Sequence, residues 1–463
     1  MINSPSPSFI GLRIGILGHF GNDNLGDEAI VQAVIENFRR RVPGVEILCF
    51  SVNPANTALR HGVAAHPVSR HDTKRSAHPS TSTAASVLPR PASSQGLRTF
   101  LKSVPGLRSM VLFLRAAASL PLNLLQEARF IRQSRGSLRG LDLLLIAGSN
   151  QFLDNFGGVW GFPYSMLKWA WLGRSCGCKV AFVSVGAGPL TSPVSRLFVR
   201  LAMRAAHEVS FRDEASRAIA VCAWAGQGAR VAPDLAFSLT IPISAGDASF
   251  GSKPIVGINP MPVHDSRYWH EANEKAYARY VRELAAFCAL VDAAGYPWYF
   301  YATQPKDVNV MHDMIGQLKH HGLKSEELAG RIFNPRTVDE LVSRLAQTDI
   351  LVATRFHGVV LSLMAGRPAL GVCYHRKTAD VLDKIGLGGF HVHIDALDAQ
   401  AAVGMLRRLD EQREALQEKV REQARVYRAE LDEQYELLLN LVPRARRSHA
   451  QSPKRAGIAD LPS

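Results

Sequence analysis

The chain contains, in its C-terminal third, the stretch Ile350-Leu351-Val352-Ala353-Thr354-Arg355-Phe356-His357-Gly358. Its first four residues form a short apolar run, which predicts a buried strand, and the small-residue segment that follows predicts a helix. In open parallel sheets, ligands bind beyond the carboxyl ends of the strands. An arginine and a histidine at such an end therefore predict a site that holds a cation and an acid/base group.

A second segment of this kind lies near the other end of the chain. The run at residues 13–18 predicts a strand, and residues 19–27 form a loop rich in glycine and asparagine. A helix is expected over residues 28–41 and a further strand over residues 45–52. This order is typical of the start of a parallel α/β domain.

Together these segments resemble the polysaccharide pyruvyl transferase family, whose members typically open with Gly-Tyr-Tyr-Gly-x-x-Asn-x-Gly-Asp-Glu-Ala and later carry Arg-x-His-Gly before Ala-Gly-x-Pro. Two middle segments, at residues 210–216 and 232–239, extend the resemblance in the same order and spacing. It covers roughly residues 12–60 and 140–390. One departure stands out, because the family usually shows Gly-Gly-Gly where this chain has Ala147-Gly148-Ser149. The shape of that loop is left open.

The resemblance implies a reaction and roles for four residues. Pyruvyl transfer protonates the methylene carbon of phosphoenolpyruvate, joins the cationic carbon to a sugar hydroxyl, and closes a cyclic ketal with a second hydroxyl. His357 would be the general acid, and Arg212, Arg355 and Lys377 would bind the phosphate and carboxylate of the donor. From the residues alone, one alternative is that Arg355 and His357 pair with neighbouring acids, although their position after a buried strand favours a functional role. The alternative for Arg212 is an ion pair where a helix begins.

Further candidates lie on the loops after the first strand and after the strand at residues 141–147. Two acids at the start of a helix are expected to accept hydrogen bonds from sugar hydroxyls or to hold the loop, with helix capping as the alternative. Side-chain amides suit sugar hydroxyls as well. The candidate acceptor-binding or loop-shaping residues are Asn22, Asn24, Gly26, Asp27, Glu28, Asn150 and Gln151.

The composition indicates a globular protein with anionic partners. The 463 residues exceed the usual size of one core, so two domains are expected. A formal net charge of +14 indicates phosphorylated metabolites, nucleic acid or an anionic membrane as partners. The sequence shows no nucleic-acid recognition motif, so nucleic acid is not expected. Cys176-Gly177-Cys178 lacks a second pair of ligands, so we expect no metal, and no cofactor besides the donor substrate phosphoenolpyruvate.

The order of elements predicts an α/β protein with two Rossmann-like domains that face each other across a cleft, as in glycosyltransferases of the B type; the resemblance implies the same. The serine- and proline-rich residues 71–96 are expected to be a disordered insert. The predicted divisions are an N-terminal, acceptor-side domain at 1–242, a linker at 243–253, a C-terminal, donor-side domain at 254–400, a long C-terminal helix at 401–442 and a disordered basic tail at 443–463.

Two segments keep alternative interpretations. Residues 97–135 combine apolar clusters with arginines at helical spacing, and residues 97–140 contain eight basic residues against one acid. Such a helix either lies on an anionic membrane, where it would meet lipid-linked glycans, or packs on its own domain with a solvated basic face, which we favour. The apolar stripe of residues 401–442 favours packing on the N-terminal domain over a coiled coil.

These observations lead to one expected function and two alternatives. We expect transfer of a pyruvyl group from phosphoenolpyruvate to a sugar or lipid-linked oligosaccharide in exopolysaccharide or cell-surface glycan synthesis. The alternatives are a glycosyltransferase that uses a nucleotide sugar, and a non-catalytic glycan-binding relative. Without a recognisable signal peptide or membrane span, a cytoplasmic enzyme is expected, either free or peripheral at the inner face of the membrane.

Overall fold

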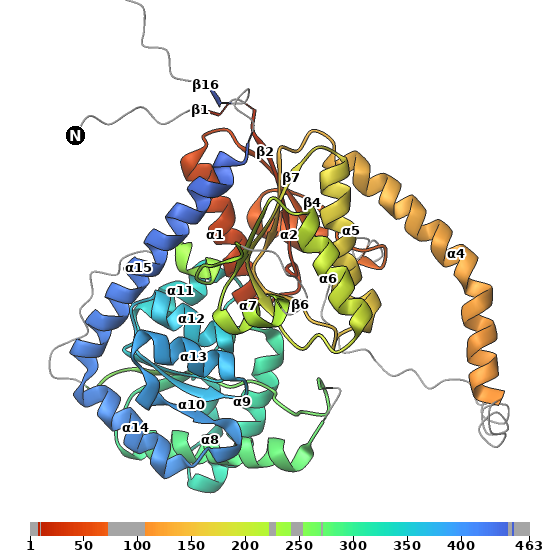
Figure 1. Cartoon of the computed structure of the whole chain (residues 1–463). Coiled ribbons are helices and arrows are strands. Elements are labelled where there is room, and N and C mark those ends of the chain that lie inside the picture. Colours follow the sequence, from red (N-terminus) through yellow and green to blue (C-terminus); the bar gives the residue numbers. More distant parts are fainter. Residues whose placement is uncertain are drawn as a thin grey trace, which may run out of the picture.

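The computed structural model describes residues 8–9, 11–72, 107–221, 228–241, 253–269, 272–442 and 447–448. The predicted insert at 71–96 and the predicted linker at 243–253 lie almost wholly outside these residues, as does most of the tail at 443–463. Within the described part, two α/β domains lie one above the other and the long helix α15 (Arg413–Asn440) runs along both (Figure 1). Near the termini, β1 (Ser8–Phe9) pairs antiparallel with β16 (Arg447–Ser448).

The N-terminal domain is built on a sheet of parallel strands in the order β4-β3-β2-β5-β7-β8-β9, with β6 beside the end of β7. The strands are β2 (Arg13–Leu17), β3 (Glu46–Ser51), β4 (Ala64–Pro67), β5 (Leu143–Ala147), β6 (Asn150–Phe152), β7 (Lys179–Ala187), β8 (Glu208–Phe211) and β9 (Arg230–Val231). The helices are α1 (Leu25–Arg41), α2 (Pro54–His61), α4 (Leu107–Leu138), α5 (Phe162–Ser175), α6 (Pro193–Ala205) and α7 (Glu214–Val221), with 3-10 turns η3 (Gly158–Trp160) and η4 (Leu235–Ser238).

The C-terminal domain has a second parallel sheet, in the order β12-β11-β10-β13-β14-β15. Its strands are β10 (Val256–Asn259), β11 (Trp298–Tyr301), β12 (Ile332–Phe333), β13 (Ile350–Ala353), β14 (Ala369–Cys373) and β15 (His391–His393). Its helices are α8 (Glu274–Ala293), α9 (Pro305–Leu318), α10 (Ser325–Ala329), α11 (Val338–Ala346), α12 (Phe356–Met364), α13 (Arg376–Ile385) and α14 (Ala399–Glu411), with turns η5 (Lys319–His321), η6 (Gly388–Phe390) and η7 (Ile394–Ala396).

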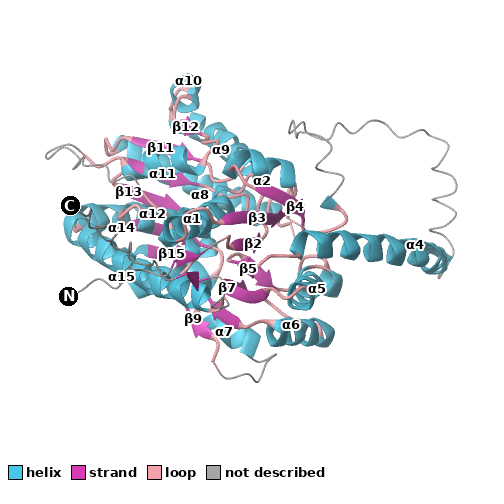
Figure 2. Cartoon of the chain, turned by 90° about the horizontal axis from the view of Figure 1, so that it is seen from above, coloured by secondary structure: helices cyan, strands magenta, loops and turns pink. Residues whose placement is uncertain are grey.

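In each sheet the strand that comes first in the sequence, β2 or β10, lies in the interior of the sheet. The chain adds the strands on one side of it before it crosses to the other side. The switch falls between β2 and β5 in one domain and between β10 and β13 in the other, which is where doubly wound sheets bind ligands. Strands such as β5 and β14 are buried throughout, because helices cover both faces of each sheet (Figure 2).

The carboxyl ends of the two sheets face each other. The backbone N–H of Leu25, the first residue of α1, donates to the carbonyl of Thr303, in the loop after β11, at 2.9 Å. The predicted fold class, two Rossmann-like domains across a cleft with a long C-terminal helix, is therefore confirmed.

The C-terminal segment forms two helices where one was predicted. Helix α14 ends at Glu411, and α15 begins at Arg413, after Gln412 leaves the helical conformation. Helix α14 packs on α8 of the C-terminal domain, whereas α15 crosses to the N-terminal domain, where Gln434 accepts from Ser210 at 2.6 Å. The single-helix prediction was wrong because no glycine or proline marks the break, which is set by the two packing surfaces.

Helix α4 covers most of the basic segment predicted at 97–135 and continues to Leu138. In its C-terminal half, Phe130 is buried and Glu127 forms an ion pair with Lys168 of α5 at 2.9 Å, so this half packs on its own domain. Residues 97–106 and the side chains of residues 107–120 lie outside the described part. Among the described helices, none is both long and apolar enough to cross a membrane.

Candidate active site

A cavity of about 180 Å³ lies between the domains, and its lining residues lie in loops that follow the carboxyl ends of strands or at the start of the next element. From the N-terminal domain come the loops after β2, β5 and β8, and from the C-terminal domain those after β13 and β14. The lining residues are Asn24, Asp27, Ser149, Asn150, Arg212, Arg355, Phe356, His357 and Tyr374. Most of the candidates predicted from the sequence are thus brought together.

His357 lies in the first turn of α12, and its imidazole is largely buried against the N-terminal domain. Its Nε2 is buried and, within the described part of the chain, makes no hydrogen bond. The nearest acid is Asp234, whose Oδ2 lies 3.9 Å from this nitrogen. Asp234 is itself fixed, because its Oδ1 accepts from the backbone N–H of Ala236 at 3.0 Å. The imidazole is therefore held next to a carboxylate, with one ring nitrogen available.

Arg212 follows β8 and is almost completely buried. Its guanidinium lies over the ring of Phe356, 4.4 Å from the centroid, and its Nη2 donates to Oδ1 of Asn150 at 2.7 Å. Two carboxylates lie farther away, at 3.4 Å for Asp213 and 3.5 Å for Asp234. These carboxylates therefore neutralise the positive charge of Arg212 only weakly. The ion pair expected at the start of a helix exists, but it is not the closest contact of Arg212.

Lys377 approaches the same point from the other domain. Its Nζ donates to two uncharged oxygens, Oδ1 of Asn150 at 3.1 Å and the carbonyl of Ala187. Burial, reinforced by the positive charge of Arg212, lowers the pKa of Lys377 to about 8. Two cations from facing domains therefore share one amide oxygen, an arrangement that a bound anion would stabilise.

Arg355 differs from these two cations because it is tightly paired. Its Nε donates to both carboxylate oxygens of Asp307, at 2.7 and 2.8 Å, and its Nη2 donates to Oδ1 at 2.5 Å. Asp307 also accepts from the backbone N–H groups of Thr303 and Gln304, both at 3.0 Å. The alternative in which Arg355 pairs with a neighbouring acid is the arrangement that the structure shows.

Asp27 is buried at the edge of the cavity and accepts from Nδ2 of Asn24 at 2.5 Å. Burial raises the pKa of its carboxyl to about 6, and neighbouring carboxylates add to the rise. The imidazole of His357 and the amide of Asn24 act in the opposite direction. A carboxyl with a pKa near the working pH is suited to proton transfer.

Asp27→Asn is expected to stabilise the fold at pH 7.5 by up to about 3 kcal/mol, the equivalent of a two-unit pKa shift. Between pH 4 and pH 6 the folded state binds more protons than the unfolded state, so the cost of the buried carboxylate grows as the pH rises and is complete above pH 6. Urea unfolding of both proteins at pH 7.5 and pH 4 measures this difference. A gain of the same size at both values would contradict it.

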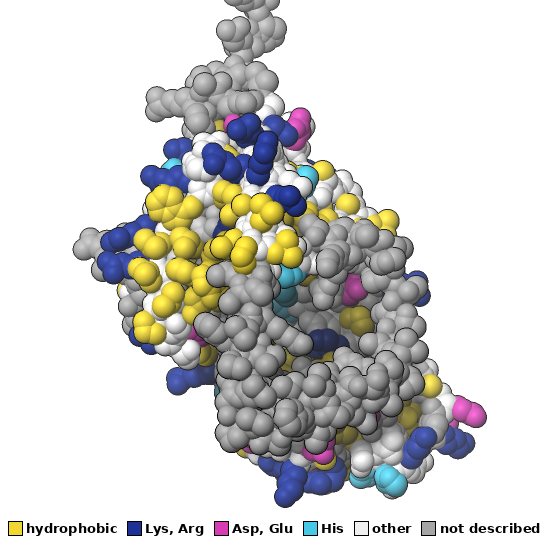
Figure 3. Space-filling model, turned by 90° about the vertical axis from the view of Figure 1, so that its right-hand side faces the viewer, with side chains coloured by type: hydrophobic (Ala, Val, Ile, Leu, Met, Phe, Trp, Pro, Cys, Tyr) yellow, Lys and Arg dark blue, Asp and Glu magenta, His cyan; other side chains and the backbone are white. Residues whose placement is uncertain are grey.

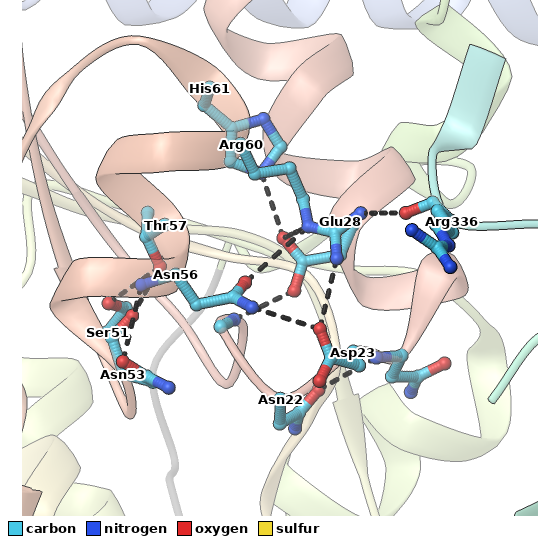
Figure 4. A network of polar contacts seen from close by, with 12 residues as sticks. Asn22, Asp23, Glu28, Ser51, Asn53, Asn56, Thr57, Arg60, His61 and Arg336 are labelled. Atoms are coloured by element: carbon cyan, nitrogen blue, oxygen red, sulfur yellow. Dashed lines mark hydrogen bonds and ion pairs between the residues drawn. The ribbon is translucent and has the colours of Figure 1, made fainter. Parts of the chain in front are cut away.

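Glu28, the neighbouring acid, does not line the cavity and belongs to a polar network with residues of α2 (Figure 4). Its Oε1 accepts from the backbone N–H of Gly21 at 2.8 Å, and its Oε2 lies 2.8 Å from Nε2 of His61. Arg60 extends the network by donating to Asp23 at 3.0 Å and to the carbonyl of Arg336 in the C-terminal domain at 2.5 Å. Glu28 therefore shapes the loop instead of lining the cavity.

The remaining asparagines of this loop are bound within it. Asn24 is the N-cap of α1, and its Oδ1 accepts from the N–H of Gly26 at 3.3 Å, so the helix begins three residues earlier than predicted. Asn22 accepts from the N–H of Asn24 at 3.1 Å. Gly26 packs so closely on the side chain of His357 that a Cβ there would lie less than 3.0 Å from Cβ, Cγ and Nδ1 of His357.

The loop that departs from the family pattern keeps a glycine-like shape. Gly148 and Ser149 both adopt a left-handed backbone, with φ of 53° and 58°. Gln151 is completely buried, and its Nε2 donates to the carbonyls of Ala147 and Gly148 at 3.1 and 3.2 Å. Gln151 thus holds this turn and does not line the cavity, whereas Asn150 does.

Five residues in or beside the cavity were not among the sequence-based candidates: Ser149, Phe356 and Tyr374 line it, and Asp234 and Asp307 contact residues that line it. Asp234 and Phe356 lie inside motifs that carried the family resemblance, so their positions beside the predicted residues were an available signal. Asp307 is the partner of Arg355 only because the start of α9 lies within reach of the turn after β13, which no local pattern shows.

A second cavity, of about 210 Å³, adjoins the first on the far side of Phe356. It shares Arg212 and Phe356 with the first cavity, is also lined by Lys377, and extends to Tyr427 and Glu430 of α15. Arg212 therefore lines both cavities, whereas Lys377 lines the second.

A sequence model of the family described as polysaccharide pyruvyl transferase matches residues 24–376, which include almost the whole site. The chain belongs to this family. Membership makes it a transferase that acts in polysaccharide modification. No curated protein matches the chain in sequence.

Solved structures resemble the chain at low identity. An α,α-trehalose-phosphate synthase (UDP-forming) from Burkholderia vietnamiensis is 13% identical, with a TM-score of 0.48 over 95% of this chain and 99% of that one. An α,α-trehalose 6-phosphate synthase from Burkholderia multivorans is 14% identical, with a TM-score of 0.49 over 93% and 97%. The ADP-heptose heptosyltransferase II of E. coli is 12% identical, with a TM-score of 0.43 over 87% and 100%. The fold class rests on the topology of the two sheets.

Proposed function

We propose that the protein transfers a pyruvyl group from phosphoenolpyruvate to two hydroxyls of a sugar and forms a cyclic ketal in exopolysaccharide or cell-surface glycan synthesis. The observation that carries the proposal is the meeting of Arg212 and Lys377, from opposite domains, at Oδ1 of Asn150. The donor carries a phosphate and a carboxylate, and these two cations have the charge and placement to receive one of them. Family membership supports the same reaction class.

His357 is assigned the proton transfer to the donor. A protonated imidazole delivers its proton to the methylene carbon, and the adjacent carbon becomes cationic and is attacked by the first sugar hydroxyl. Phosphate then leaves, and the second hydroxyl attacks to close the ketal. Asp234, 3.9 Å from Nε2, would stabilise the charged imidazole before transfer.

Asp27 is assigned to the acceptor. Each attacking hydroxyl must lose a proton, and a carboxylate at the edge of the cavity with a pKa of about 6 can accept it. Arg355, with its bidentate bond to Asp307, would mainly orient the turn that carries His357, and it adds its positive charge to the donor site. The acceptor is a sugar or a lipid-linked oligosaccharide, and the proposed reaction uses no cofactor.

The experiment that tests this function incubates the full chain with phosphoenolpyruvate and candidate glycans, and follows phosphate release together with the mass of the glycan. A pyruvate ketal on the product and an equal amount of phosphate are expected. Turnover of a nucleotide sugar, with no phosphate released from phosphoenolpyruvate, would establish the glycosyltransferase alternative instead. Binding of glycan without turnover of either donor would indicate the non-catalytic alternative.

Lys377→Gln is expected to weaken phosphoenolpyruvate binding about 10- to 100-fold at pH 7, the usual loss for one hydrogen bond to a charged group. Because the pKa of Lys377 is about 8, donor affinity of the wild type should fall as the pH rises from 7 to 9, and the variant should lack this dependence. Calorimetric titration at three pH values measures both. Lys319→Gln, which removes an exposed charge from a residue that lines neither cavity, is the control. An unchanged affinity in Lys377→Gln would place the donor elsewhere.

A further inference from the structure

The outer surface of the N-terminal domain carries an apolar face that is not covered by any described part of the chain. Helices α5 and α6 lie on the side of the sheet opposite α1 (Figures 1 and 2). Helix α6 buries one side, including Val199 and Met203, against this sheet. Its other side presents a second apolar stripe at the spacing of one helix face. The stripe consists of Val194, Leu197, Phe198 and Leu201.

Two tryptophans extend this stripe. Trp160 of η3 is 73% exposed and stands edge-on to Phe198, with ring centroids 6.0 Å apart. Trp171 of α5 is 49% exposed, and its Nε1 donates to the carbonyl of Leu201 at 3.3 Å. We call the six residues Trp160, Trp171, Val194, Leu197, Phe198 and Leu201 the α6 face. Hydrophobic side chains gather on this side of the molecule, with basic side chains among and around them (Figure 3).

The charged residues of helices α5 and α6 are all positive. Helices α5 and α6 contain no aspartate or glutamate, and they carry Arg174, Arg196, Arg200 and Arg204. Where these arginines have partners, the partners are carbonyls: Arg174 donates to Ala205 at 3.2 Å and Arg196 to Leu190 at 2.9 Å. Among the described residues, none of the four forms an ion pair with an acid. Their charge is available to an external anion.

We propose that the α6 face is a docking surface for an anionic lipid bilayer. Exposed aliphatic residues enter the acyl boundary, tryptophans lie at the level of the headgroups, and arginines bind the anionic headgroups. A protein partner would require acidic groups opposite four arginines as well as a complementary apolar surface. An anionic bilayer supplies both the negative charge and the apolar region, and it needs no complementary shape.

The α6 face is connected to the candidate active site. The segment after β6 joins Asn150, which binds both cations, to Trp160. The segment after β7 joins Ala187, whose carbonyl accepts from Lys377, to the start of α6. Asp154 ties these two segments together by accepting from the N–H groups of Thr191 at 3.1 Å and Ser192 at 2.9 Å. If the proposed function holds, a docked bilayer would bring a lipid-linked acceptor to the mouth of the cleft.

The test is co-sedimentation of the full chain with vesicles that contain phosphatidylglycerol, compared with vesicles of phosphatidylcholine alone. We expect binding to the anionic vesicles that weakens as salt is added. Each basic residue near such a surface contributes about a fivefold factor, so Arg196→Gln with Arg204→Gln should lower the binding constant about 25-fold. Trp160→Ser with Leu197→Ser should lower it at least tenfold.

The matched control is Lys275→Gln with Lys319→Gln, which removes the same charge from exposed positions of the C-terminal domain and should leave binding within about twofold. Thermal melting confirms that each variant is folded. Equal sedimentation of the face variants and the control, or no binding by the wild type, would overturn the proposal. So would a wild-type dimer in the absence of lipid that the Trp160 and Leu197 changes convert to a monomer. Because this readout needs no turnover, it succeeds or fails independently of the proposed reaction.

Discussion

Replacing His357 with glutamine is expected to lower turnover of phosphoenolpyruvate by about 10²- to 10⁴-fold, the usual contribution of a positioned general acid. Glutamine keeps a hydrogen-bonding group of similar length, but it cannot deliver a proton to carbon. Donor affinity should change little, since the anion is assigned to Arg212 and Lys377. The loss should therefore appear in kcat, while the dissociation constant of phosphoenolpyruvate stays within a few-fold.

Single-turnover kinetics and calorimetric titration of the same preparations measure these two quantities. His312→Gln, an exposed histidine on α9, is the matched control and should behave as the wild type. Turnover within tenfold of the wild type would remove His357 from the proton transfer. Asp27, with its raised pKa at the edge of the same cavity, would then be the group to examine.

The sequence predicted the placement of this site well because the determinants are local. A buried apolar run followed by Thr354-Arg355-Phe356-His357 is sufficient to put two side chains at a strand's carboxyl end. Two such segments in parallel sheets then converge once the domains face each other. The cavity accordingly contains Asn24, Asp27, Asn150, Arg212, Arg355 and His357, all of which were candidates.

What the sequence did not predict depends on contacts between distant segments. Asp307, the partner of Arg355, is 48 positions away in the sequence. Asn150 and Gln151 are adjacent amides, and the sequence does not show that Asn150 lines the cavity while Gln151 binds the backbone of its own loop. The break at Gln412 follows from two packing surfaces and has no local signal. Ser149 replaces a glycine of the family pattern, yet it adopts the left-handed backbone that glycine favours.

Gly26→Ala is expected to reduce turnover as strongly as the loss of His357 itself. A methyl group at this position would lie less than 3.0 Å from Cγ, Cβ and Nδ1 of His357, so the imidazole must rotate or the two domains must separate. The effect should not arise from α1, because alanine is the better helix former by about 1 kcal/mol. The prediction is thus a loss of activity in a protein whose free energy of unfolding is nearly unchanged.

Two comparisons make this prediction decisive. Gly316→Ala, in α9 with open space around the new methyl group, is the matched control and should keep full turnover with a small gain in stability. The double variant Gly26→Ala with His357→Gln should be no slower than His357→Gln alone, since both changes act through one imidazole. Multiplicative losses in the double variant would show that Gly26 acts by another route. Full turnover in Gly26→Ala would mean that the domains are not as close during catalysis as the structure shows.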